Sequence, residues 1–378
     1  MKLTIERAAL LKALGHVQSV VERRNTIPIL SNVLLVAGPG RVAFSATDLD
    51  MEITDSTPAQ VESPGQITAP AHTLYEIVRK LPDGADVSLT YTGEDPRLIV
   101  QAGRSRFHLP VLPAGDFPVM SSDDLAGGAS LAASDLMRLI DKTRFAISTE
   151  ETRYYLNGLY LHAVVEDGQA RLRAVATDGR RLALAEMPAP DGFAGSPGVI
   201  IPRKTITEAR RLLDDAGAEV AISVSAQKVR IGVGDTVITS KVIDGSFPRY
   251  AEVIPHANPR VMRVDAALLA AAVDRVATIS TEQSRAVQMA IEPGRVTLTV
   301  RTMDASQAVE ELEVDYEGEP FDVGFNARYL LDVTAQVGGE LVELRFSEHA
   351  GAARPVDPVL ALDPTDAGVQ YVLVPLRA

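Results

Sequence analysis

The chain of 378 residues contains no cysteine, so it can form neither disulfide bonds nor metal sites built on thiolate ligands. No apolar run approaches the length of a membrane span. Glu6 and Arg7 interrupt the stretch in which a signal peptide would need an unbroken hydrophobic region. These absences predict a cytoplasmic protein that makes no membrane contact.

Signatures of catalysis are missing as well. The sequence has no P-loop, no Gly-x-Ser-x-Gly, no His-Glu-x-x-His and no pair of histidines at i, i+4. Gly232 and Gly234 begin a Gly-x-Gly phrase, but the third glycine is missing and the strand-like setting favours a turn. Residues 177–181 (TDGRR) contain Asp and Gly, so a hairpin turn explains them as well as a functional site does. We therefore expect no enzyme activity and no bound metal or cofactor.

The charge of the chain limits its possible contacts with nucleic acid. A net charge of −13 argues against indiscriminate nucleic-acid binding, which normally requires a basic protein. A local basic surface on an acidic protein is still compatible with this value. The hydrophobic fraction of 46% and the charged fraction of 23% are those of an ordinary globular protein.

Two phrases occur three times each, in the same order and at nearly the same spacing. The first phrase occupies residues 5–14, 131–140 and 264–273, and the second begins at Ala69, Ile201 and Phe325. A threefold repeat of roughly 120 to 130 residues indicates three similar domains, each large enough to bury its own core. Because the Pro/Gly-rich segments near residues 113–128 and 248–259 are natural linkers, we predict domains at residues 1–125, 126–255 and 256–378.

Each repeat predicts the same series of elements. A short alternating strand leads into a helix, with Ser134 or Asp135 as the predicted N-cap in the second repeat and Asp265 in the third. Alternating runs at residues 41–54, 170–187 and 295–312 predict hairpins, and the second phrase begins another helix. Hairpins imply antiparallel sheets, so each repeat is expected to be an α+β domain with two helices packed on antiparallel sheets.

Cationic residues occur at matching positions of the repeated helices. They are Lys12 and His16, then Arg138 and Lys142, on the first helices, and His72, Lys204 and Arg328 on the second helices. In the third repeat, the first helix has Ala270 and Asp274 instead. A solvated face explains the cations of any single helix, but it does not explain matched cations in an acidic protein. If the repeats close into a ring, these helices could direct their cations at a phosphate backbone.

Four phrases carry a resemblance to a known family: MKLTIER at residues 1–7, RYYLNG at 153–158, TDGRRL at 177–182 and YVLVPLRA at 371–378. In family order and over the whole chain, they resemble the bacterial DNA polymerase III β subunit, the β sliding clamp. The resemblance implies a head-to-tail homodimer whose six domains form a ring, with helices lining the hole and sheets outside. It also implies a processivity factor without catalytic activity or cofactor, which encircles double-stranded DNA of any sequence and tethers the replicative polymerase.

The resemblance and the basic helices together predict three sets of contact residues. The predicted DNA contacts are Arg24, His72, Arg138, Lys142, Tyr154, Tyr155, Arg203 and Lys204. The predicted dimer interface places Phe107 and Leu109 against Thr278 and Ile279. A groove for partner peptides is predicted at Leu156, Thr177, Gly179, Arg180, Arg181, Leu182, Pro248, Asn326, Tyr329, Val372, Val374, Pro375, Leu376 and Arg377. The implied partners are the DNA polymerase III α subunit, the clamp loader, and other polymerases or repair proteins that carry linear clamp-binding peptides.

Two other classes of protein remain open. A non-replicative scaffold with the same repeat would bind partner peptides without requiring circular DNA. A DNA-processing enzyme would need a metal or nucleotide site, and the sequence offers neither.

Overall fold

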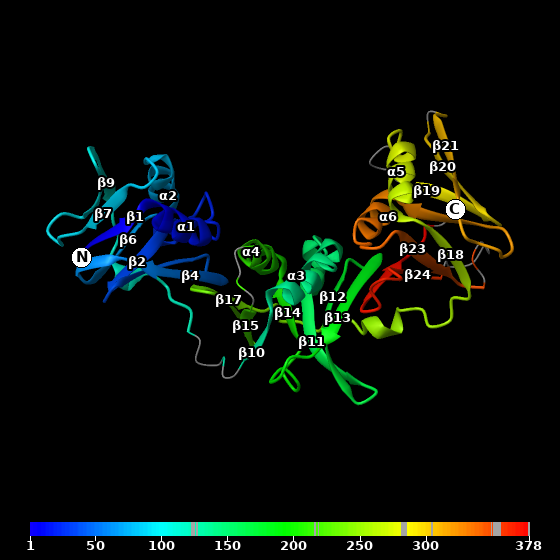
Figure 1. Ribbon diagram of the computed structural model, residues 1–378, viewed down its shortest axis with the longest axis horizontal. Coiled ribbons are helices and arrows are strands. Elements are labelled where there is room, and N and C mark those ends of the chain that lie inside the picture. The colour runs from blue at the N-terminus through cyan, green and yellow to red at the C-terminus, as the bar shows by residue number, and fades with distance from the viewer. Residues whose placement is uncertain are drawn as a thin grey trace. The chain divides into compact units, whose positions relative to one another are not determined.

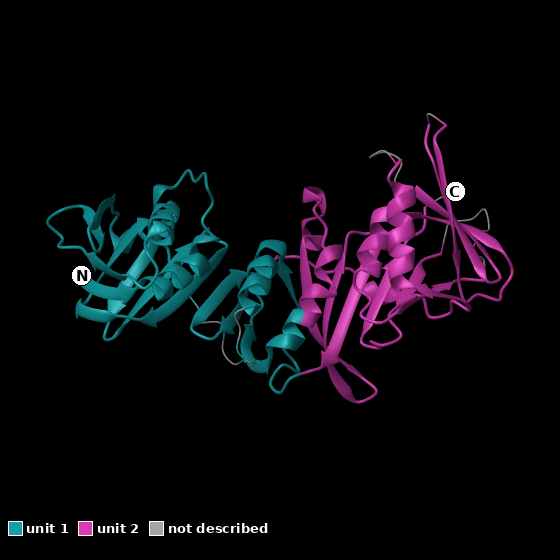
Figure 2. Cartoon of the chain, turned by 45° about the horizontal axis from the view of Figure 1, so that its top comes forward, with its two compact units in different colours: residues 1–137, 190–242 teal, residues 138–189, 243–378 magenta. Residues whose placement is uncertain are grey.

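The computed structural model describes residues 1–378 apart from 122–124, 126–127, 215–216, 218, 281–285, 304, 349, 351–356 and 377–378. It divides into two compact units, which Figure 2 shows in different colours. Unit 1 comprises Met1–Met137 and Pro190–Val242, and unit 2 comprises Arg138–Ala189 and Ile243–Ala378. Among the described residues, no helix is both long and apolar enough to cross a membrane.

Helices and strands follow the repeats of the sequence (Figure 1). The first repeat contains β1 (Lys2–Glu6), α1 (Arg7–Gln18), β2 (Asn32–Gly38), β3 (Arg41–Thr47), β4 (Met51–Pro58), β5 (Gln60–Ser63), β6 (Gly65–Pro70), α2 (Ala71–Lys80), β7 (Asp86–Thr90), β8 (Arg97–Ala102) and β9 (Ser105–Pro110). The second contains β10 (Ala129–Ala132), α3 (Ala133–Asp141), the 3-10 turns η3 (Arg144–Ala146) and η4 (Glu151–Leu156), β11 (Gly158–Glu166), β12 (Gln169–Thr177), β13 (Arg181–Pro188), β14 (Val199–Pro202), α4 (Arg203–Leu213), β15 (Glu219–Val224), β16 (Lys228–Val233) and β17 (Thr236–Lys241). The third contains β18 (Arg260–Asp265), α5 (Ala266–Ala277), β19 (Ala286–Glu292), β20 (Arg295–Arg301), β21 (Gln307–Glu313), β22 (Phe321–Asn326), α6 (Ala327–Thr334), β23 (Leu341–Phe346), β24 (Val359–Leu362) and β25 (Val369–Leu373).

The order of elements makes strands of different repeats equivalent. The third strand after the first helix is β4 in the first repeat, β13 in the second and β21 in the third. The last strand is β9 in the first repeat, β17 in the second and β25 in the third. The strand pairs in the described sheets are antiparallel, and the described part of each repeat has two α-helices. The predicted α+β fold is therefore confirmed.

The sheets join neighbouring repeats inside each unit. In unit 1, one sheet has the order β5-β1-β7-β8-β9 and the other has the order β10-β15-β16-β17-β4-β3-β2-β6. In unit 2, one sheet includes the series β11-β12-β13-β25-β24-β23-β18 and the other has the order β21-β20-β19-β22. The last strand of one repeat thus pairs with the third strand of the repeat before it, as β17 with β4 and β25 with β13. Strands β9 and β21 lie at the edges of their described sheets.

The helix starts test the predicted N-caps. Asp265 caps α5 as predicted, because its carboxylate accepts a hydrogen bond from the Leu268 amide at 2.8 Å. The prediction of Ser134 or Asp135 as the cap of α3 is wrong, since the helix already begins at Ala133. Strand β10 runs directly into this helix, so Asp135 lies in the first turn, where its charge still complements the helix dipole.

Helical periodicity explains which residues of the first two helices form the core of unit 1. Leu10, Leu14 and Val17 of α1 are fully buried, as are Leu74 and Val78 of α2. Their spacing of three or four residues puts them on one face of each helix. The two helices contact each other, and α1 also packs on β3 and β4. Apolar side chains therefore fix the helices on the sheet and leave the opposite helix faces for polar residues.

Glu52 is a buried carboxylate on β4. It is 9% exposed and accepts hydrogen bonds from the Met120 amide at 2.9 Å and from the Thr54 hydroxyl at 3.4 Å. Burial raises the pKa of Glu52, against the opposing effect of the two hydrogen bonds. A pKa raised by folding means that this group contributes most to stability at low pH. That contribution is lost as the pH rises through the folded-state pKa.

We predict that Glu52→Gln raises the melting temperature at pH 7. The amide oxygen can still accept from Met120, and the cost of burying a charge is removed. The difference from the unmodified protein should shrink toward acid pH, where Glu52 itself becomes neutral. Thermal melts from pH 4 to pH 8 measure this, with Glu52→Ala as the control that leaves the Met120 amide unpaired. A Gln variant less stable than the unmodified protein at pH 7 would contradict the prediction.

Candidate functional site

A cavity of about 220 Å³ in unit 2 lies where most of the predicted groove residues meet. We call it the unit 2 cavity, and its lining consists of Arg153, Tyr155, Leu156, Thr177, Gly179, Arg181, Leu182, Pro248, Tyr250, Val253, Val372 and Val374. These residues come from η4, from the turn between β12 and β13, from residues 248–253, and from the end of β25. Segments far apart in the sequence are brought together because β25 pairs with β13, with Val372 directly opposite Leu182.

Buried apolar residues support the wall of the unit 2 cavity. Leu182, Tyr250 and Val372 belong both to the lining and to a core cluster. Tyr160 and Phe247 pack against this cluster, with stacked rings whose centroids lie 4.8 Å apart. A firm apolar wall suits an apolar anchor side chain, whose burial contributes about 1.5 to 3 kcal/mol.

A hydrogen bond to His162 fixes Tyr250 in this wall. The Nδ1 atom of His162 lies 3.3 Å from the Ala163 carbonyl, and its Nε2 atom lies 2.9 Å from the Tyr250 hydroxyl. Burial lowers the pKa of His162, which favours the neutral ring. A neutral ring that donates from Nδ1 accepts at Nε2, so the tyrosine hydroxyl is the donor in this pair. Burial also raises the pKa of Tyr250, which keeps that hydroxyl protonated.

The turn between β12 and β13 forms another side of the cavity. Asp178 Oδ1 accepts hydrogen bonds from the amides of Arg180 and Arg181 at 2.9 and 3.1 Å. The Thr177 hydroxyl donates to the Arg181 carbonyl at 2.6 Å. Gly179 has a φ of +84°, a value that favours glycine. The hairpin-turn interpretation of residues 177–181 is confirmed, and the same turn also lines a cavity.

Five predicted groove residues with a described structure are absent from the cavity lining: Arg180, Asn326, Tyr329, Pro375 and Leu376. The Arg180 carbonyl accepts a hydrogen bond from the Val374 amide at 2.9 Å. Asn326 caps α6 through a hydrogen bond from the Arg328 amide at 3.0 Å. Leu376 donates its amide to the Gly324 carbonyl at 2.8 Å. Arg377 lies outside the described residues.

Four lining residues were missing from the predicted groove. Arg153, Tyr250 and Val253 were not predicted as site residues, and Tyr155 was predicted as a DNA contact. The signal was present, because residues 153–155 directly precede Leu156 and residues 250–253 follow Pro248 closely. Tyr154, the neighbour of Tyr155, is 55% exposed, and its ring meets the Tyr155 ring edge to face at 5.8 Å.

The predicted DNA contacts fall into two groups. Arg24 and Arg203 are exposed, and neither side chain has a hydrogen-bond or ion-pair partner among the described residues. Lys204 pairs with Asp48 and lies 3.6 Å from Glu22, and His72 Nδ1 lies 2.8 Å from the Gln18 side-chain oxygen.

Arg138 and Lys142 of α3 are bound to residues of the third repeat. Arg138 donates from Nε to Asp366 at 3.0 Å, and Lys142 donates to the Gln336 carbonyl. Arg138 also donates to the Glu186 carbonyl at 3.0 Å. Both side chains therefore form hydrogen bonds that connect the second repeat with the third.

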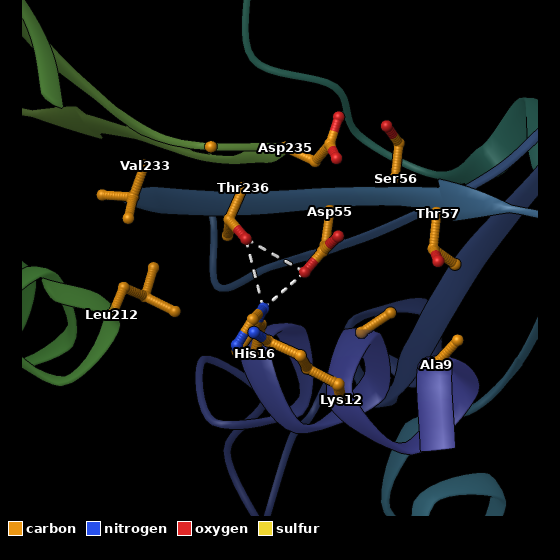
Figure 3. A pocket seen from close by; sticks show the side chains of 12 residues that line it. Ala9, Lys12, His16, Asp55, Ser56, Thr57, Leu212, Val233, Asp235 and Thr236 are labelled. Carbon is orange, nitrogen blue, oxygen red and sulfur yellow. Dashed lines mark hydrogen bonds and ion pairs between the residues drawn. The ribbon is translucent and has the colours of Figure 1, made fainter. Parts of the chain in front are cut away.

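His16 does not belong to a basic surface, so that part of the sequence interpretation is wrong. It is 7% exposed and pairs with Asp55 through Nδ1 in a cavity of about 270 Å³ in unit 1 (Figure 3). The Thr236 hydroxyl lies 3.0 Å from Asp55 Oδ2 and 3.1 Å from His16 Nδ1. The pairing of β17 with β4 places Thr236 directly opposite Asp55 and encloses the histidine, which helix periodicity alone could not reveal.

The predicted dimer residues lie at separate places in the two units. Phe107 is half-buried and Leu109 is buried on β9, at the edge of its sheet. Thr278 is the C-cap of α5 and is exposed, and the following Ile279 is half-buried.

Three sequence-family matches cover nearly the whole chain. They are the N-terminal, central and C-terminal domains of the DNA polymerase III beta subunit, at residues 1–121, 130–249 and 251–377. The chain belongs to the DNA polymerase III beta subunit family. The function shown by this membership is that of a beta sliding clamp in DNA replication, which favours the predicted clamp over a non-replicative scaffold. The family is one of processivity factors and indicates no catalytic activity.

Individual beta sliding clamps match over their full length. The clamp of Caulobacter vibrioides is 69% identical and that of Escherichia coli K12 is 35% identical, with 100% of each chain covered. A crystal structure of the C. crescentus clamp, with PEG bound to a putative beta-motif tethering region, has a TM-score of 0.97 at 68% identity and covers 100% of this chain and 99% of its own. The Bartonella birtlesii clamp bound to griselimycin has a TM-score of 0.95 at 45% identity, with 100% of both chains covered.

We predict that Gly179→Ala distorts the unit 2 cavity. A Cβ atom there would collide with the Arg153 guanidinium, and the positive φ adds about 1 to 2 kcal/mol of backbone strain. Gly168→Ala is the matched control, because its φ is +75° and a Cβ atom added there would meet nothing within 4 Å. Both variants should melt at lower temperature, but only Gly179→Ala should displace Arg153 in a crystal structure. An unmoved Arg153 in Gly179→Ala would contradict this account of the turn.

Proposed function

We propose that this chain forms a head-to-tail homodimeric ring of six domains around double-stranded DNA and tethers its partners through the unit 2 cavity. The domains are those of the three repeats, with boundaries near residues 125 and 255. The partners are the DNA polymerase III α subunit, the clamp loader, and other polymerases or repair proteins with linear clamp-binding peptides. The observation that carries the proposal is the use of equivalent strands at successive junctions.

The strand equivalence predicts how two copies join. Strand β4 pairs with β17, and the equivalent β13 pairs with the equivalent β25. This leaves one third strand, β21, and one last strand, β9, and both lie at the edges of their described sheets. Pairing β21 of one copy with β9 of another repeats the same junction and covers both edges. Two copies joined twice in this way close a ring of six domains.

The exposed charges on the two edges are opposite in sign. Strand β9 exposes Arg106, and β21 exposes Glu311 and Glu313. Charge complementarity of this kind favours pairing of unlike edges and disfavours pairing of an edge with its own copy. The expected contacts of Phe107 and Leu109 with Thr278 and Ile279 would add an apolar part to the same interface.

We predict that Phe107→Glu combined with Ile279→Glu converts the dimer to monomer. Both side chains are half-buried in the isolated chain, so a charge at each would be costly once the interface closes over it. Native mass spectrometry at micromolar concentration measures the change. Val165→Glu is the control, because Val165 is a 68% exposed apolar residue on β11, outside the proposed interface. An unmodified protein that is only monomeric, or a double variant that remains dimeric, would contradict the proposed ring.

Contacts to DNA would be weak and independent of sequence. Arg24 and Arg203 are the predicted cations best placed to reach a phosphate, because they are exposed and have no partner among the described residues. Tyr154 offers an exposed aromatic ring on η4. His72, Arg138, Lys142, Lys204 and Tyr155 are held by contacts within the protein and would contribute less. A ring held by topology needs no tight contacts, so the net charge of −13 is compatible with sliding.

We predict that the double variant Arg24→Ala with Arg203→Ala binds DNA with a weaker dependence on salt. The slope of log K against log salt should become less steep by about 0.9 for each phosphate contact that is lost. Arg138→Ala with Lys142→Ala is the comparison. It should mainly lower the melting temperature, because those side chains bind Asp366 and Gln336. Fluorescence anisotropy with a short labelled duplex, repeated at several low salt concentrations, measures the slopes. Equal slopes for the first variant and the unmodified protein would remove both arginines from the DNA surface.

The C-terminal segment forms part of the proposed peptide site. Val374 lines the unit 2 cavity and is 36% exposed, whereas Tyr371, Val372 and Leu373 are almost fully buried in β25. Strand β25 ends at Leu373, so removing the segment from Val374 onward keeps the whole strand. It also removes the buried Pro375 and the amide hydrogen bonds that Val374 and Leu376 donate to Arg180 and Gly324.

The direct test of function is primer extension on a primed single-stranded circle with polymerase and clamp loader. The unmodified protein should lengthen the products made in one binding event. Deletion of residues 374–378 should abolish this effect and peptide binding, while the dimer mass and the fold by circular dichroism persist. Product lengths that are the same with and without the protein would contradict the proposed function. Loss of the fold in the deletion variant would instead assign the segment to the core.

A further inference from the structure

We infer that Asp332 is a positioning residue for the peptide site: it holds Arg181 against Tyr329, so that the turn at residues 177–181, one wall of the unit 2 cavity, is preformed against helix α6. The inference rests on the proposed peptide-binding function and goes beyond it. Asp332 itself is absent from the lining of the unit 2 cavity, so it would act on the cavity through Arg181; its other ion-pair partner, at 3.7 Å, is Arg328 on the same helix.

Arg181 is a cavity residue whose guanidinium is occupied by the protein. Its side chain is 7% exposed. Nε donates to Asp178 Oδ2 at 3.1 Å, Nη2 donates to the Phe145 carbonyl at 2.7 Å, and Nη1 donates to Asp332. Two of these partners belong to the second repeat, and Asp332 on α6 belongs to the third. Of the three hydrogen bonds, only the one to Asp332 therefore connects the turn to the third repeat.

Two aromatic rings complete the setting of Arg181. The guanidinium carbon lies 4.5 Å from the centroid of the Tyr329 ring and 5.2 Å from that of Phe145. Tyr329 is on α6, three residues before Asp332, so one helix turn carries both the ring and the carboxylate that face Arg181. Asp332 thus holds the Nη1 side of the guanidinium beside the Tyr329 ring, while Asp178 and the Phe145 carbonyl hold Nε and Nη2. Burial raises the pKa of Tyr329, so the ring faces Arg181 as a neutral phenol.

The ion pair between Arg181 and Asp332 can fix the position of the guanidinium, because a buried charge is stable only beside an opposite charge or hydrogen-bond acceptors. Removing Asp332 would leave Nη1 of Arg181 without its acceptor and the buried guanidinium with Asp178 as the remaining one of these two carboxylates, so Arg181 would shift toward Asp178, water or another acceptor. Its movement would release Tyr329 and alter the turn that holds Gly179 and Leu182 in the cavity lining. In the variant, only a fraction of the molecules would have the wall correctly formed. A peptide bound to one of those molecules would make the same contacts as in the unmodified protein.

Population arithmetic gives the expected size of the effect. The apparent Kd equals the intrinsic Kd divided by the fraction of molecules with a competent site. If loss of Asp332 reduces that fraction to about one tenth, the Kd rises about tenfold. The loss should appear in the association rate, because peptide bound to a formed wall leaves at the original rate. A residue that touches the peptide would instead mainly change the dissociation rate.

The test measures association and dissociation of a fluorescein-labelled peptide from the clamp-binding segment of the DNA polymerase III α subunit, using the full-length dimer. Asp332→Ala should raise the Kd about tenfold through slower association. Asp332→Asn should have a smaller effect, because its amide oxygen can still accept from Arg181. The Asn variant also keeps the test informative if the Ala variant folds poorly.

Asp366→Ala is the matched control. Asp366 also pairs with an arginine of the second repeat, Arg138, and its side chain is 24% exposed against 29% for Asp332. It lies outside the cavity lining, so this variant should bind the peptide as the unmodified protein does. The inference is overturned if Asp332→Ala binds normally, if Asp366→Ala loses as much affinity, or if the loss lies in dissociation alone. An unmodified protein that does not bind the peptide would overturn the proposed peptide-binding function, and this inference with it.

Discussion

Pairing between the third strand of one repeat and the last strand of the next is the constraint on which the rest of the structure depends. The β4–β17 pair places Thr236 opposite Asp55, and the β13–β25 pair places Val372 opposite Leu182. The first pairing encloses His16, and the second builds the unit 2 cavity. The same pairing, applied to the two strands left at sheet edges, gives the proposed contact between two copies of the chain.

Polar side chains near these pairings are largely used to hold repeats together. Arg211 of α4 donates to the His16 carbonyl at 2.8 Å, Arg138 binds Asp366, and Arg181 binds Asp332. Cations that resemble a DNA-binding surface in the sequence are thus partly neutralised inside the protein. This use of charge fits a ring that holds DNA by closure, because strong attraction to phosphate would slow its sliding.

Local features of the sequence predicted local features of the fold well. The Asp265 cap and the turn at residues 177–181 depend on neighbours within three or four residues, and both were identified from the sequence. The partners of His16 and Arg138 could not be, because Asp55 and Asp366 are distant in the chain. Asp55 meets His16 when α1 packs on β4, and Asp366 meets Arg138 when the second and third repeats join. Tyr250 and Val253 were missed although they closely follow Pro248, because their contribution to the cavity beside Leu182 becomes visible only in the folded unit.

The central claim is that closure around DNA, rather than affinity for it, keeps the protein in place. The most direct measurement is the lifetime of the loaded, labelled protein on a closed circular plasmid, before and after a restriction enzyme cuts the circle. The account predicts a long lifetime on the circle and rapid loss from the free ends once it is linear. The same lifetime on circular and linear DNA, or tight sequence-specific binding to a short linear duplex, would contradict it.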